Sequence, residues 1–176
     1  MFDVDQLVAD CRAAVAQGDA LRSIKEVLER AMSDPAAIAK ALPPDRAEIV
    51  PLHVSPEVTV LKVVWAPGMS FPPHNHLMWA AIGLYAGQED NTFYRRVPGA
   101  IEESGGRQIR VREVALLGSD TIHAVTNPLL SFAGAIHVYG GDLPHAAGRS
   151  EWAEPSFDEV VYDFDRTLRY FESAND

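Results

Sequence analysis

Two histidines, His74 and His76, are separated by a single residue, and this spacing can hold a metal ion. In a β-strand, residues i and i+2 point to the same face, so both imidazoles would project in one direction. Imidazole binds zinc, copper, iron and nickel, and only the neutral ring binds. A third histidine, His123, follows the turn-like segment Gly118-Ser119-Asp120 and begins another predicted strand. If these two strands are neighbours, three imidazoles surround one position.

A second pair of chemically active residues, His137 and Tyr139, has the same spacing. Both side chains would face one side of a predicted strand, where they could orient a substrate and transfer a proton. The alternative is a structural histidine beside a core tyrosine whose hydroxyl finds a partner. The remaining histidines, His53 and His145, are predicted to lie at the surface or to support the site rather than to bind metal.

The histidine spacing resembles the two sequence motifs of the cupin superfamily. Residues 68–76 read Gly-x5-His-x-His, with Gly87 after the next strand, and His123-x3-Asn127 is similar to the second motif. The resemblance covers residues 58–139. It implies a mainly β fold, the double-stranded β-helix (jelly-roll) barrel, with a metal ion inside. Asn127 is expected to hydrogen-bond the turn around His123.

The common cupin motif adds a glutamate ligand four or five residues after the second histidine, where this chain has Ala80 and Ala81. A shell of three histidines without a carboxylate resembles the thiol dioxygenases of the cysteine dioxygenase type. The segment Ala135–Tyr139 is similar to the Ser-x-His-x-Tyr relay of that family, with alanine in place of serine. The resemblance implies Fe(II) on His74, His76 and His123, and oxidation of a small thiol to its sulfinate with O2.

The residue that would anchor a substrate is less evident. The family arginine that holds the substrate carboxylate would fall near Glu48–His53, where no arginine stands. Arg95 and Arg96 are adjacent on a predicted strand, so one of them should face inward and could take this role. Trp79 is expected to line the pocket. Two alternatives stay open: a cupin metalloenzyme with zinc, nickel or another divalent metal that acts on a non-thiol small molecule, and a cupin binding protein without catalysis.

The elements around these residues divide the chain into three parts within one predicted domain, residues 1–176. Residues 1–44 show helical spacing with Asp3, Asp19 and Asp34 as N-caps, and Cys11 falls on the buried stripe. Residues 45–141 form the barrel, and residues 142–176 a C-terminal extension with a helix over 165–172. Glu89 and Asp90 are interpreted as the solvated tip of a hairpin. Besides the strand around His74, the predicted strands are Glu48–Val54, Val58–Ala66, Leu77–Tyr85, Asn91–Arg96, Ile109–Leu116, Ala124–Asn127 and Leu130–Tyr139.

Composition restricts the partners. The chain carries 15 basic and 25 acidic residues, a net charge of −10, which argues against nucleic acid or an anionic membrane as the main partner. One cysteine excludes an internal disulfide and a cysteine-rich zinc site. No export signal or transmembrane run is evident, so a cytoplasmic protein is expected. The expected partners are a small-molecule substrate and O2, and exposed strand edges would allow a homodimer.

Overall fold

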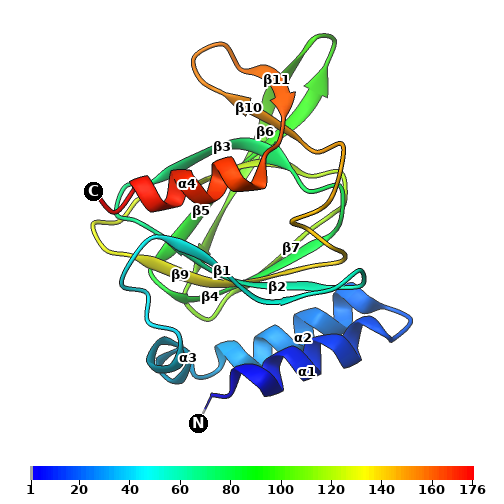
Figure 1. Cartoon of the computed structure of the whole chain (residues 1–176), viewed down its shortest axis with the longest axis vertical. Helices are drawn as coiled ribbons and strands as arrows, with labels where there is room; N and C mark the ends of the chain where they lie inside the picture. Colours follow the sequence, from blue (N-terminus) through cyan, green and yellow to red (C-terminus); the bar gives the residue numbers. More distant parts are fainter. Residues whose placement is uncertain (1) are drawn as a thin grey trace.

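Two antiparallel sheets form the barrel in a computed structural model that describes residues 2–176 (Figure 1). The five-stranded sheet has the order β1-β2-β9-β4-β7 and the six-stranded sheet the order β11-β10-β3-β8-β5-β6. The fold is therefore mainly β, the double-stranded β-helix predicted from the histidine motifs. The strands are β1 (Glu48–Val54), β2 (Thr59–Trp65), β3 (Ser70–Asn75), β4 (Ala80–Ala86), β5 (Gln88–Val97), β6 (Ala100–Arg110), β7 (Val114–Leu117), β8 (Ile122–Thr126), β9 (Ala133–Tyr139), β10 (Ser150–Ala153) and β11 (Asp158–Val161).

The helices before the barrel begin at the predicted caps. Helices α1 (Val4–Val15), α2 (Ala20–Met32) and α3 (Pro35–Ala41) follow Asp3, Asp19 and Asp34, whose carboxylates accept backbone N–H groups of the first turn. In Figure 1, α1 and α2 lie against the outer face of the five-stranded sheet. Cys11 is fully buried there, and burial raises the pKa of its thiol to about 12.

The helical lobe explains why the five-stranded sheet is apolar on both faces. Along β2, Leu61 and Val63 point into the barrel core, whereas Val60 packs beneath the helices. Because successive side chains alternate between faces, a strand that is buried on both sides carries apolar residues on both faces, and the two polar residues of β2, Thr59 and Lys62, are paired with the Gly141 carbonyl and Glu48. All seven residues of β2 are indeed buried.

Several strand predictions need correction. The strand around His74 begins at Ser70, before the two prolines, and its register with β8 shifts between Phe71 and His74, where these prolines interrupt the pairing. Strand β6 begins at Ala100, before the predicted strand over 109–116, and passes through Gly105 and Gly106. The strand predicted over 109–116 is the end of β6 and the separate β7, joined by a turn with Arg112 at φ 77°. Strands β10 and β11 were not predicted.

Helix α4 (Phe164–Ser173) follows the predicted closing helix closely and lies between the two sheets at one end of the barrel (Figure 1). The Phe171 ring packs on Trp65 with ring centroids 4.8 Å apart. Beyond the helix, Asn175 accepts the Ala47 N–H at 2.7 Å and donates to the Ala47 carbonyl at 3.0 Å. These contacts join the C-terminus to the chain entering β1. Among the described residues, no helix is long and apolar enough to cross a bilayer.

Candidate metal centre

The structure brings His74, His76 and His123 together inside the barrel, all three buried. His74 lies opposite His123 in the pairing of β3 with β8, and His76 follows immediately after β3. The Nε2 atom of His76 is 3.2 Å from His74 Nε2 and 3.4 Å from His123 Nε2. Ligands that each stand about 2 Å from one metal ion have separations of this size. This cluster can hold a metal ion.

Hydrogen bonds at the far side of two of these rings determine which nitrogen faces the centre. His74 Nδ1 donates to the Pro72 carbonyl at 3.0 Å, and His123 Nδ1 donates to Asn91 Oδ1 at 2.6 Å. Each of these rings then carries its lone pair on Nε2, toward the other imidazoles. Both lone pairs are directed into the same buried space beside His76 Nε2, where a cation can accept them. The donor set therefore fits a divalent metal.

Burial keeps the three imidazoles neutral. It lowers the pKa of His74 to about 3, although the hydrogen bond to Pro72 opposes the shift. Burial, and then the neighbouring imidazoles, hold the pKa values of His76 and His123 well below the usual range. Since only the unprotonated ring has a lone pair to donate, the cluster is ready to bind metal at neutral pH.

The His137–Tyr139 pair lies beside the cluster. His137 Nδ1 is 3.0 Å from the Tyr139 hydroxyl, and the Tyr139 ring packs edge-on against His76 with centroids 5.0 Å apart. Both residues line the same cavity as the three histidines. Burial raises the pKa of Tyr139 above its ordinary value, so the phenol stays protonated.

A buried carboxylate, Glu89, completes this group and corrects the interpretation of Glu89 and Asp90 as the solvated tip of a hairpin. Glu89 belongs to β5 and is 0% exposed. Burial would raise its pKa, but His137, together with hydrogen bonds from His137, Asn91 and Trp65, outweighs that effect and lowers it. The side chain is therefore a carboxylate.

The cavity around the histidines is small, about 40 Å³, and helix α4 contributes Phe164, Thr167 and Phe171 to its lining. Arg149 also lines it, and of the arginines in the part of the chain described it is the buried one. Its Nε donates to the Asn75 carbonyl at 3.0 Å, and its guanidinium carbon lies 3.7 Å from the Tyr162 ring centre. The cavity therefore contains a fixed positive charge close to the imidazoles.

The residues predicted to bind substrate lie elsewhere. Arg95 pairs with Glu102 and Arg96 pairs with Glu159 at 2.7 Å, both at the surface. Trp79 packs toward the helical lobe and against Gly140. None of the three lines the histidine cavity. The strand carrying the two arginines extends into a long hairpin with β6, where Arg96 lies over the ring of Trp152 from β10.

Asn127 also differs from its expected role. Its amide nitrogen donates to the carbonyls of Trp65 and Ala66, and its oxygen accepts the Leu129 N–H. It therefore ties the end of β2 to the turn after β8 rather than the turn before His123. His145 is exposed beside Asp142, as predicted. His53 is half-buried and does not belong to the histidine cluster of the described residues.

Sequence reasoning did not identify Glu89, Asn91 and Arg149 as parts of the site. The alternation along β5 could have indicated Glu89 and Asn91, because every second residue of a strand faces the same side and residues 89, 91 and 93 face inward. Nothing local distinguishes Arg149, since it comes from an irregular segment whose course depends on tertiary contacts.

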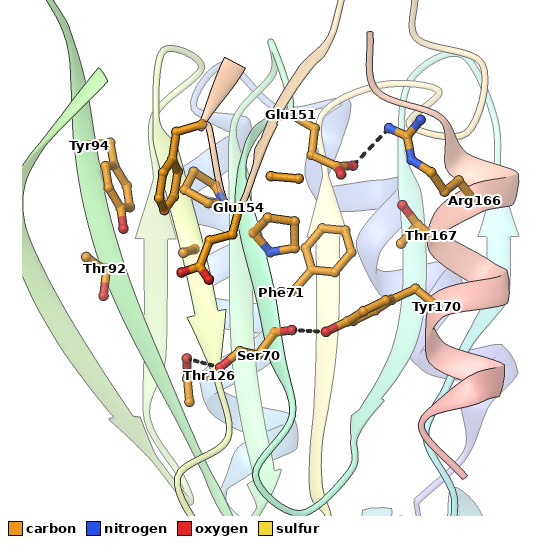
Figure 2. A pocket seen from close by; sticks show the side chains of 15 residues that line it. Ser70, Phe71, Thr92, Tyr94, Thr126, Glu151, Glu154, Arg166, Thr167 and Tyr170 are labelled. Carbon is orange, nitrogen blue, oxygen red and sulfur yellow. Dashed lines mark hydrogen bonds and ion pairs between the residues drawn. The ribbon is translucent and has the colours of Figure 1, made fainter. Parts of the chain in front are cut away.

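A larger hollow of about 650 Å³ lies on the outer face of the six-stranded sheet (Figure 2). Figure 2 shows Tyr94 and Thr92 on one side, helix α4 with Thr167 and Tyr170 on the other, and the Glu151–Arg166 ion pair above. It contains none of the clustered histidines. Phe71 and Thr167 line both hollows, so these two side chains form the wall between them.

No protein-family profile matches the chain. Among solved structures, the DMSP lyase DddQ from Ruegeria pomeroyi DSS-3 overlaps at 21% identity, covering 52% of this chain and 42% of that one, with a TM-score of 0.42. An oxalate oxidase overlaps at 19% identity over 53% and 45%, with a TM-score of 0.43. A Klebsiella pneumoniae protein with a double-stranded β-helix domain overlaps at 12% identity over 65% and 87%, with a TM-score of 0.49. The aligned region spans less than half of the lyase and the oxidase chains.

Proposed function

We propose that this protein is an Fe(II)-dependent dioxygenase that oxidises a small thiol to its sulfinate. The observation that carries the proposal is the convergence of three neutral imidazoles, with no carboxylate among them, beside a hydrogen-bonded histidine–tyrosine pair. The reaction balances without a further reductant: a thiolate RS⁻ and O2 give RSO2⁻, because both oxygen atoms are transferred to sulfur.

His74, His76 and His123 would hold the iron. When bound, Fe(II) would supply open coordination positions for a thiolate and O2 and favour the ionised thiol through its charge. Because the three ligands are neutral, they leave the full charge of the metal in place. Zinc and nickel also bind imidazole, so the native metal is part of what the experiment must establish.

The other cavity residues have separate tasks in this proposal. Arg149 would bind a carboxylate of the substrate, because its guanidinium is buried, held in place by backbone carbonyls and close to the cluster. Tyr139 would accept the thiol proton at its oxygen while its own proton passes to His137 Nδ1, 3.0 Å away. The apolar residues around them, such as Val125 and Leu143, exclude water.

The test is oxygen uptake by protein loaded anaerobically with Fe(II), offered cysteine, 3-mercaptopropionate or 2-aminoethanethiol. We expect uptake with a thiol that carries a carboxylate, one O2 per sulfinate formed, and none in His76→Ala. Wild-type protein that holds iron but consumes no oxygen with any of the three thiols would overturn the proposal. Matching metal analysis of the two proteins ensures that the comparison is made at known iron occupancy.

A second candidate is a metalloenzyme that acts on a small carboxylate without sulfur. The observation that favours it is Arg149, which would bind any carboxylate, whereas no described cavity residue is specific for sulfur. Iron-loaded protein that is inactive with thiols but turns over a sulfur-free carboxylate would select this candidate. A cupin that only binds small molecules would retain ligand binding after loss of metal and show no turnover with either class.

A further inference from the structure

Glu89 is placed where one carboxylate contacts both halves of the site. Its Oε2 accepts the Trp65 indole N–H at 2.9 Å and lies 3.3 Å from His137 Nε2, and its Oε1 accepts the Asn91 amide N–H at 3.0 Å. It does not belong to the three-histidine cluster. A fully buried carboxylate costs free energy unless each oxygen is paired, and here both oxygens are.

We propose that Glu89 is a positioning residue that fixes the ring of a metal ligand through Asn91 and the His137–Tyr139 pair through His137. The second part rests on the proposed function, because it assumes that Tyr139 takes part in the reaction. The first part concerns metal binding alone.

The metal branch follows from hydrogen-bond direction. Glu89 accepts from the amide nitrogen of Asn91, so the Asn91 oxygen must face the other way, toward His123 Nδ1 at 2.6 Å. That oxygen can only accept, so His123 carries its proton on Nδ1 and presents the Nε2 lone pair to the cluster. Partners of this kind orient metal ligands in many proteins, and their loss lowers metal affinity about 10- to 100-fold.

The second branch runs through His137. An ionised Glu89 can only accept, so His137 carries a proton on Nε2. In the neutral ring this leaves the lone pair on Nδ1, directed at the Tyr139 hydroxyl. Glu89 therefore sets the tautomer that lets His137 receive the tyrosine proton. Ala135 offers no polar side chain on the face of β9 that carries His137, and the polar partner of His137 Nε2 comes from β5.

Glu89→Gln is the sharpest substitution because it keeps the shape and changes one acceptor into a donor. All three neighbours of Glu89 donate, so a glutamine cannot satisfy them all. If its NH2 group faces Asn91, the Asn91 amide must flip and His123 loses its acceptor. If it faces Trp65 and His137, the indole loses its partner and the His137 tautomer must invert.

The experiment uses the zinc-loaded full chain, which undergoes no redox turnover. Zinc affinity is measured by competition with a chromophoric chelator, and the His137 tautomer by NMR of ¹⁵N-labelled imidazoles. We expect Glu89→Gln to lower zinc affinity about 10- to 100-fold, invert the His137 tautomer, or both. Glu102→Gln, the same change at a surface carboxylate paired with Arg95, should alter neither measurement.

Two single-branch variants keep the inference testable if Glu89→Gln does not fold. Asn91→Ala should lower zinc affinity by the same factor and leave the His137 signals in place, whereas His137→Phe should leave zinc affinity unchanged. Wild-type affinity and tautomer in Glu89→Gln, or wild-type affinity in Asn91→Ala, would overturn the inference. Loss of all zinc binding in Glu89→Gln, as expected for His76→Ala, would make Glu89 a ligand and also overturn it. Failure of the wild type to oxidise thiols would refute the proposed function without changing these outcomes.

Discussion

The position of Arg149 leads to a prediction about substrate choice. A hydrogen bond to a charged partner contributes about 1.5–3 kcal/mol, which corresponds to about 10- to 100-fold in kcat/KM. Arg149→Met keeps much of the apolar stem and removes the charge. We expect this loss with a thiol that carries a carboxylate and little change with 2-aminoethanethiol, measured as oxygen uptake on iron-loaded protein.

Arg96→Met is the matched control, since Arg96 is an exposed arginine paired with Glu159 outside the cavity. Its kinetics should equal those of the wild type. A specific loss in Arg96→Met but not in Arg149→Met would restore the anchor expected from the sequence. Equal loss on both thiols in Arg149→Met would show a structural role only.

At the scale of elements, α4 limits access to the metal centre. The cavity of about 40 Å³ has room for little more than one or two water-sized groups. Helix α4 contributes three lining residues, contacts β1, and packs Phe171 on Trp65 of β2. Its attachment through Asn175 should therefore influence both stability and access.

We predict that Asn175→Ala destabilises the protein by about 2 kcal/mol, because it removes the partners of both backbone groups of Ala47, a residue only 1% exposed. Urea denaturation measures the change, and hydrogen exchange should show lower protection in α4. The neighbouring Asp176→Ala, an exposed position, should change neither. A loss below about 0.5 kcal/mol in Asn175→Ala would show that the Asn175 hydrogen bonds do not hold the helix in place.

The elements also show what the sequence can predict. Caps such as Asp19 and the start of the barrel at Glu48 follow from local chemistry and are confirmed. The three-histidine cluster is confirmed: the spacing of His74 and His76 predicted that two imidazoles face one way, and the resemblance to the two cupin motifs added His123. Glu89 was misassigned because a charged pair after a glycine usually marks a solvated turn, and only the sheet pairing shows that the strand begins at Gln88. Arg149 depends on a long irregular segment that local patterns do not determine.

At the scale of the molecule, the metal site joins parts of the chain that are distant in sequence. Of the three clustered histidines, His74 lies on β3, His76 follows β3 directly, and His123 lies on β8. Glu89 and Asn91 belong to β5, and His137 belongs to β9. In the unfolded chain these residues do not form a site. Metal binding should therefore stabilise the folded protein through mass action.

We predict that a metal concentration 100 times the dissociation constant raises the free energy of unfolding by about 2.7 kcal/mol. For a chain of this length, that is a rise of about 5–10 °C in Tm. Thermal unfolding with zinc, and again after a chelator, measures the shift and its reversal. His76→Ala should unfold at the same temperature with and without zinc, whereas His145→Ala, at an exposed histidine outside the cluster, should retain the full shift. An equal rise in His76→Ala would place the stabilising metal elsewhere and would remove the basis for assigning the three imidazoles as ligands.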